Sequence, residues 1–108
     1  MQLMDRYEYQ DVYQDRPTIV LFSGPWCRPC KALKLLLATI EQQYASTFTF
    51  IEIDASAEPV LMVQNSVEEL PTILFLLRGE ERGRLVGSVG QDTLDAMFVA
   101  WQALVEIG

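Results

Sequence analysis

Apolar residues gather in two kinds of pattern along the chain. Residues 18–23 and 72–77 are β-branched, aliphatic or aromatic almost throughout, and such unbroken runs are typical of strands buried on both faces of a sheet. Residues 48–54 predict a third central strand. Between the strands at 18–23 and 48–54, leucine and isoleucine recur every three or four positions as far as Tyr44, which predicts a long helix with a wide apolar stripe.

The rest of the chain supplies shorter elements. The first 16 residues predict a short helix that follows a brief edge strand. A second short helix is predicted around residues 58–64, with Ser56 as a candidate cap, because serine oxygens accept hydrogen bonds from the first N–H groups of a helix. Residues 78–83 are polar and contain two glycines, so they predict a turn, followed by a hairpin strand over residues 84–88.

A final amphipathic helix completes the order of elements, since apolar side chains recur at helical spacing over residues 94–105. The predicted order is (β)αβαβαββα. Its early strand-helix-strand part implies parallel strands, and its late hairpin adds antiparallel ones. We therefore expect an α/β fold, in which helices cover both faces of a mixed central sheet, as a single domain over residues 1–108.

Charge and amino-acid content narrow the classes of function. Fifteen acidic and eight basic residues give a net charge of −7, which argues against nucleic acid as a partner, since nucleic-acid binding requires a basic face. The apolar runs are far shorter than the ~18 residues that span a bilayer, so no membrane association is expected.

The lack of histidine excludes histidine-based catalysis and histidine metal ligands, and no metal site is predicted. The N-terminus has no basic region followed by an apolar core, which favours a cytoplasmic location.

The only two cysteines of the chain, Cys27 and Cys30, stand three positions apart. They lie between a predicted strand and the long helix. Gly24 and Pro25 end the strand, and Pro29 falls in the first turn of the helix, where its missing N–H costs nothing. A Cys-x-x-Cys pair between a strand and a helix indicates redox chemistry rather than metal binding.

Thiol–disulfide exchange needs a thiolate as the attacking species. Cys27 stands at the N-terminus of the predicted helix, where free N–H groups and the helix dipole favour negative charge. Cys30 lies one turn inside and is more shielded. We therefore assign Cys27 as the nucleophile and Cys30 as the resolving thiol. The dithiol is itself the redox centre, so no cofactor is expected.

Three other interpretations compete with a reactive dithiol. Inert core cysteines are not expected on a turn that holds Gly24, Pro25 and Pro29. A zinc site would need a dimer, because the chain has neither histidine nor a second cysteine pair. A static disulfide that closes so short a loop would stabilise the fold little.

The residues from Trp26 to Lys31 resemble the active-site sequence of the thioredoxin family, whose usual form is Trp-Cys-Gly-Pro-Cys-Lys. The likeness covers nearly the whole chain, and its matches follow in the family's order, which makes it more specific than a lone Cys-x-x-Cys pair. It implies the thioredoxin fold and a protein thiol–disulfide oxidoreductase. The further matches are Phe22, Asp54, Leu70-Pro71-Thr72, Gly79 and Gly87.

The resemblance also implies a substrate groove. In the family, the proline that matches Pro71 is cis and lies beside the cysteines. Its predecessor, here Leu70, offers backbone groups to an extended substrate strand. The groove would be lined by Trp26, Leu70, Pro71 and Gly87. The sequence alone leaves it equally open that Pro71 merely starts a strand.

Several positions depart from the family's pattern. The glycine inside its motif is Arg28 here, and its buried aspartate and the lysine partner of that aspartate fall at Leu21 and Phe50. Its helix-kinking proline falls at Leu35, and a second tryptophan falls at Ser23. Since the family's aspartate is thought to help deprotonate the resolving cysteine, another carboxylate or water has to serve in this chain.

These departures predict a dithiol more oxidising than that of an ordinary thioredoxin. Arg28 adds a positive charge next to Cys27, and the missing carboxylate removes a negative one, so both changes favour the thiolate. Each ~1.4 kcal/mol of such stabilisation raises the potential by ~30 mV. Screening of an exposed Arg28 would keep the effect small. Lys31 and Lys34 are expected on a solvated helix face.

Protein disulfides are the expected substrates, a reductase or another thiol donor is expected to recycle the dithiol, and the chain is expected to be a monomer. Two alternatives stay open. Arg28 would suit a disulfide oxidase or isomerase, which needs an oxidising compartment. A non-catalytic thioredoxin-like binding module would use the groove around Trp26 and Leu70, but it has no need of both cysteines.

Overall fold

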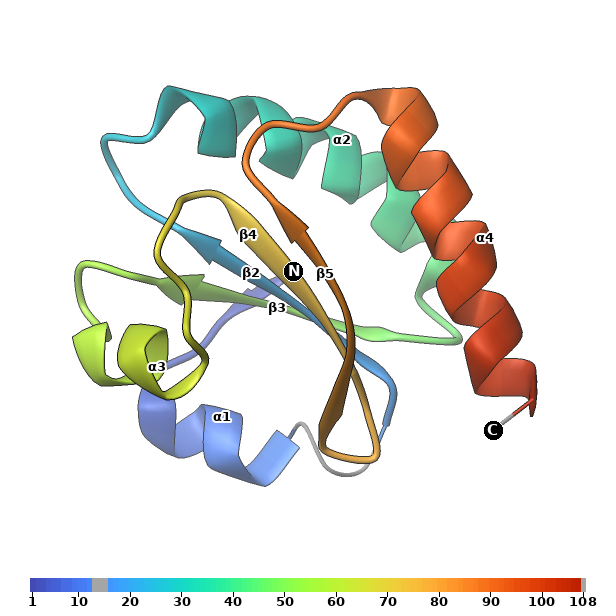
Figure 1. The fold of residues 1–108 in the computed structure, drawn as a ribbon, viewed down its shortest axis with the longest axis horizontal. Helices are drawn as coiled ribbons and strands as arrows, with labels where there is room; N and C mark the ends of the chain where they lie inside the picture. The colour runs from blue at the N-terminus through green and yellow to red at the C-terminus, as the bar shows by residue number, and fades with distance from the viewer. Residues whose placement is uncertain (13–15, 108) are drawn as a thin grey trace.

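A computed structural model describes residues 1–12 and 16–107 of the chain, as a sheet between two layers of helices (Figure 1). The order of elements is the predicted one. In chain order they are β1 (Gln2–Leu3), α1 (Arg6–Val12), β2 (Thr18–Ser23), α2 (Arg28–Tyr44), β3 (Thr49–Asp54), α3 (Pro59–Gln64), β4 (Thr72–Leu77), β5 (Glu80–Val86) and α4 (Gln91–Ile107).

The strands form one mixed sheet in the order β1-β3-β2-β4-β5. β1 and β2 run parallel to β3, whereas β4 is antiparallel to β2 and β5 is antiparallel to β4. The parallel β2–β3 pair requires a crossover connection, which α2 provides. Because β2 is the middle strand, its carboxyl end delivers the Cys-x-x-Cys turn to the centre of the sheet edge.

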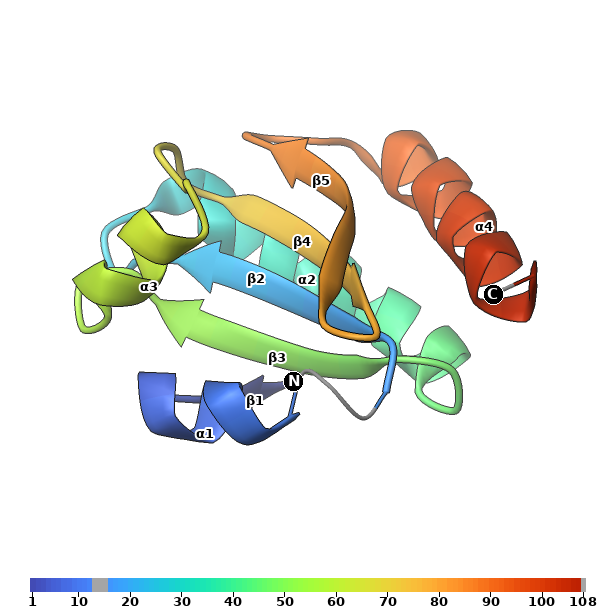
Figure 2. The ribbon, with the colours of Figure 1, turned by 60° about the horizontal axis from the view of Figure 1, so that its bottom comes forward.

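Alternate side chains of the strands build two cores on opposite faces of the sheet. Ile19 and Leu21 of β2 join apolar side chains of α2 and α4, whereas Val20 and Phe22 join apolar side chains of α1 and α3. Figure 2 shows the same division, with α1 and α3 on the side of the sheet opposite to α2. The predicted mixed sheet with helices on both faces is confirmed. None of the described helices is long and apolar enough to cross a membrane.

The β4–β5 hairpin is tighter than predicted. β5 begins at Glu80 rather than at Arg84, so the predicted turn over residues 78–83 is wrong. The turn consists of Arg78 and Gly79, with φ values of 54° and 78°, and a two-residue hairpin turn of this kind requires positive φ at both positions. Backbone pairing with β4 therefore holds residues 80–83 in β5, although their polar composition indicated a turn.

The predicted cap of α3 is also wrong. The N-cap residue is Glu58, which makes no side-chain cap hydrogen bond. Ser56 instead folds back on the end of β3, where its N–H and its hydroxyl donate to Asp54 Oδ1 at 2.9 and 2.7 Å. Pro59 then begins the helix. Short polar side chains favour both caps and turns, and the sequence does not distinguish the two.

Candidate active site

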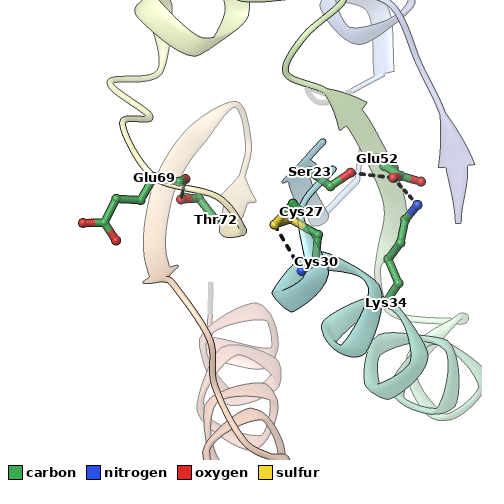
Figure 3. The surroundings of a disulfide bond; sticks show 7 residues. All are labelled: Ser23, Cys27, Cys30, Lys34, Glu52, Glu69 and Thr72. Carbon is green, nitrogen blue, oxygen red and sulfur yellow. Dashed lines mark hydrogen bonds and ion pairs between the residues drawn. A yellow bond between two sulfur atoms is a disulfide. The ribbon is translucent and has the colours of Figure 1, made fainter. Parts of the chain in front are cut away.

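Cys27 and Cys30 lie at the junction of β2 and α2. Cys27 is the N-cap residue of α2, with extended backbone angles (φ −91°, ψ 104°). The Cys30 N–H donates to Cys27 Sγ at 3.2 Å, and the Cys27 N–H donates to the Gly24 carbonyl at 3.2 Å. The two sulfurs form a disulfide, with 5.2 Å between the Cα atoms (Figure 3). The turn therefore fixes Cys27 Sγ at the positive end of the helix dipole.

The two cysteines differ in their access to solvent. Cys30 is 1% exposed, whereas Cys27 is only partly buried. Trp26, Arg28 and Pro29 flank Cys27 and are all exposed, with the Trp26 side chain at 87%. A partner protein can therefore reach Cys27 directly, while Cys30 is reached through Cys27.

The loop between α3 and β4 carries Leu70 and Pro71, two of the four residues predicted for the substrate groove. The Leu70–Pro71 peptide bond is cis, as the resemblance implies. The Gly87 N–H donates to the Pro71 carbonyl at 2.8 Å, and Gly87 has a φ of 83°, a conformation that favours glycine. A Cβ on Gly24 would lie 3.2 Å from Leu70 Cδ1. The loop thus packs against the turn that bears the cysteines.

Arg84 anchors the start of the same loop, which the sequence does not reveal. Its guanidinium donates to the carbonyl oxygens of Asn65 and Ser66 at 2.5 and 2.9 Å, and to both carboxylate oxygens of Glu81 at 2.7 and 2.8 Å. The hydrogen bond to Glu81 raises the pKa of Arg84, against the opposing effect of burial. The charged side chain of Arg84 therefore holds the segment that leads to Leu70 against β5, the edge strand of the sheet.

A charge network near the dithiol is the main feature missed at the sequence level. Glu52 Oε2 accepts a hydrogen bond from Ser23 Oγ and pairs with Lys34 Nζ, each at 2.6 Å (Figure 3). Ser23 is 4% exposed, and the side chains of Glu52 and Lys34 are 14% and 42% exposed. Lys34 is thus partly solvated, as predicted, but its amine also forms an ion pair that the sequence does not reveal. The available signal was Glu52 itself, an acid inside a largely apolar central strand.

Comparison with known proteins identifies the family. The thioredoxin family model matches residues 2–100, nearly the whole sequence. The chain belongs to the thioredoxin family. Its thioredoxin relatives include the chloroplastic M-type protein of Brassica napus, 31% identical over 80 residues, and the thioredoxin of Porphyra purpurea, 24% identical over 90 residues. The first alignment covers 74% of this chain and 45% of that protein, and the second covers 83% and 84%. The chain therefore spans less than half of the chloroplastic relative.

Membership of the thioredoxin family confirms the expected fold. Thioredoxins are thiol–disulfide oxidoreductases that act on protein disulfides, are reduced by a reductase, and use the dithiol itself as the redox centre. Within residues 1–12 and 16–107, no group of three or more His, Cys, Asp or Glu side chains is placed to hold a metal ion.

The expected cytoplasmic location is contradicted by the comparison. The relatives from Brassica napus, Spinacia oleracea and Pisum sativum are all named chloroplastic M-type thioredoxins. These names place those relatives in chloroplasts, whereas the red-algal relatives are named simply thioredoxin. The prediction considered only the pattern of a secretory signal, which differs in composition from that of a chloroplast transit peptide.

Proposed function

We propose that this protein reduces disulfides of partner proteins through Cys27 and Cys30. The proposal rests on the contrast between an accessible Cys27 at the N-cap and a Cys30 that is 1% exposed one turn inside. The Cys27 thiolate attacks one sulfur of the partner disulfide, forms a mixed disulfide and releases the other sulfur as a thiolate. Cys30 then attacks Cys27 Sγ, which closes the Cys27–Cys30 disulfide and releases the reduced partner.

The position of Cys27 supports its role as the nucleophile. The Cys30 N–H points at its sulfur at 3.2 Å, and the dipole of α2 favours negative charge at this end. Arg28, the first residue of α2, adds a neighbouring positive charge. A thiolate is stabilised in such surroundings relative to a thiol, so Cys27 is the sulfur that begins the reaction.

Insulin reduction with dithiothreitol as the electron donor tests this assignment. We expect the protein to accelerate the reaction, and the Cys27→Ser variant to fall to the rate of dithiothreitol alone, because a serine hydroxyl does not replace a thiolate in disulfide exchange. Circular dichroism of the variant serves as the control for folding. Full activity in a folded Cys27→Ser variant would refute the assignment.

We further propose that Trp26, Leu70, Pro71 and Gly87 form a groove around the dithiol that takes an extended protein segment as substrate. The exposed ring of Trp26 provides an apolar platform beside Cys27, and the bond from Gly87 to Pro71 holds the opposite wall. The partner's backbone would pair with Leu70, a form of β-strand addition. We also propose that a reductase or another thiol donor recycles the dithiol and that the protein acts as a monomer.

We further expect a reduction potential some tens of mV above the value of about −270 mV for thioredoxin. Arg28 supports this expectation, because its charge lies next to Cys27 and stabilises the reduced form. Titration against glutathione buffers measures the potential, and Arg28→Gly is the matched variant, expected to lower it. A wild-type value at or below that of thioredoxin would contradict the prediction. A value near the −180 mV of protein disulfide isomerase would favour an oxidase or isomerase instead.

A further inference from the structure

The charge network of Ser23, Lys34 and Glu52 needs a functional explanation. A carboxylate that is 14% exposed loses much of its hydration and is retained only where partners compensate for the loss. Glu52 has two such partners, and both converge on its Oε2 at 2.6 Å. The cross-strand neighbour of Glu52 on β2 is Leu21, so an apolar residue at position 52 would have joined an existing apolar core.

Two of the three residues of this network, Ser23 and Lys34, come from the segments that hold the dithiol. Lys34 lies four residues after Cys30 on α2, and residues four apart share one face of a helix. Ser23 is the last residue of β2 and precedes Gly24, whose carbonyl accepts the Cys27 N–H at 3.2 Å. Figure 3 shows the Ser23 and Lys34 side chains pointing to Glu52 from these two segments.

The chemistry of Cys30 requires a proton acceptor, because the resolving step needs its thiolate. Cys30 is 1% exposed, so bulk solvent cannot take its proton directly while a partner covers Cys27. The hydroxyl oxygen of Ser23 donates its own proton to Glu52 and keeps lone pairs for another donor. An open cavity of about 210 Å³, lined by Ser23, Gly24, Lys34 and Glu52 among others, has room for water molecules.

We propose that Glu52 takes up the proton of Cys30 during the resolving step, with the Ser23 hydroxyl or cavity water as the relay. This inference rests on the proposed function. The Cys30 thiol loses its proton to the carboxylate, the thiolate attacks Cys27 Sγ, and the Cys27–Cys30 bond forms. The bond between Cys27 and the partner breaks, its electron pair leaves with the partner sulfur, and that sulfur then takes up a proton. Lys34 holds the carboxylate in place as an ion pair.

Among the described residues that line this cavity, Asp54 is the only charged one besides Glu52 and Lys34. Lys34 faces Glu52 from α2, and Asp54 lines the cavity from the same strand as Glu52. β1 and β2 contribute Leu3 and Ser23 to the lining, neither of which carries charge. Asp54 Oδ1 is engaged by Ser56, through an N–H and a hydroxyl. Glu52 is therefore the carboxylate that a relay through Ser23 reaches.

A single-turnover reaction with one equivalent of 5,5′-dithiobis(2-nitrobenzoate) separates the two steps. Attack by Cys27 releases the first thionitrobenzoate, and resolution by Cys30 releases the second, so each appears as its own phase in stopped-flow absorbance. We expect Glu52→Gln to slow the second phase about 100-fold at pH 7, the lower end for a lost general base. The first phase keeps its rate, which shows that the variant is folded and that Cys27 is active.

The pH dependence distinguishes proton transfer from a structural effect. As pH rises, hydroxide replaces the missing acceptor, so the ratio of wild-type to Glu52→Gln second-phase rates is expected to shrink toward one. Ser23→Ala is expected to show the same pH-dependent slowing to a smaller degree. Glu41→Gln, which removes an ion-paired carboxylate from the other end of α2, is the matched control and leaves both phases unchanged.

Three results would overturn the proposal. One is a second phase of wild-type rate in folded Glu52→Gln. Another is a slowing that stays constant between pH 6 and 9, which would indicate a purely structural role. The third is a pH-dependent slowing in Asp54→Asn but not in Glu52→Gln. A missing first phase in the wild-type protein would instead refute the proposed function, so the two failures are distinguishable.

Discussion

The Cys30→Ser variant is expected to remain covalently bound to its substrate. Cys27 still attacks the partner disulfide in this variant, but the serine hydroxyl that replaces the buried thiol does not displace the partner. Cys30 is 1% exposed and lies against Cys27 at the first turn of α2, so in the wild-type protein it is placed to resolve the mixed disulfide from within the same molecule. The mixed disulfide should therefore accumulate to about one partner per protein, whereas the wild-type protein retains almost none.

Intact-mass measurement and non-reducing electrophoresis detect this adduct after the reduced variant, freed of dithiothreitol, is mixed with insulin. Dithiothreitol should remove the adduct, and the Cys27→Ser variant should form none. Accumulation in Cys27→Ser instead would reverse the roles of the two cysteines. A partner held equally well by a variant that lacks both cysteines would support the binding-module alternative.

The central strands and the redox turn are predictable from the sequence because their signals are local. Every residue of β2 and β4 is buried, so their sequences contain no solvent-facing position that could obscure the pattern. The turn is equally self-contained. Gly24, Pro25 and Pro29 end one element and begin the next, and the Cys27 N-cap follows from the spacing of these residues.

Contacts between distant segments are not readable in the same way. The residues of β5 are exposed or only partly buried, and backbone pairing with β4 holds them, so their composition indicates a turn. The network of Ser23, Lys34 and Glu52 joins β2, α2 and β3. The sequence pattern of any one of these segments therefore does not predict that the three side chains are in contact.

The family resemblance does not reveal the carboxylate of Glu52 near the dithiol. It aligns the family's aspartate with Leu21, which implies a dithiol without a nearby base. Glu52 pairs in register with Leu21 across the β2–β3 ladder, and neighbouring strands lie about 4.8 Å apart. The carboxylate therefore starts one strand away from the aligned position, and its amine comes from α2 instead of β3. An alignment compares one position at a time, so it does not show that a charge missing at one position is present at its neighbour on the adjacent strand.

Replacing Trp101 with alanine is expected to lower the free energy of unfolding by about 3–5 kcal/mol. The side chain is 2% exposed. Its ring stacks on Phe75 and meets Phe98 edge-on, with centroid distances of 5.3 Å in both cases, and so joins α4 to β4. Guanidinium unfolding followed by circular dichroism measures the loss. Val99→Ala on the same helix, where the side chain is 63% exposed, is the matched control, expected within about 0.5 kcal/mol of wild type.

Gly83 provides a sharper test of this packing, because a Cβ there would lie 2.9 Å from Trp101 Cε2 and closer still to Nε1. Gly83→Ala is expected to cost about 1–3 kcal/mol in the wild-type protein, since the indole has to shift. In the Trp101→Ala background the space is empty, and the same change should cost almost nothing. The double variant is therefore expected to be more stable than the sum of the two single losses implies. Additivity within about 0.5 kcal/mol would contradict the contact between β5 and α4.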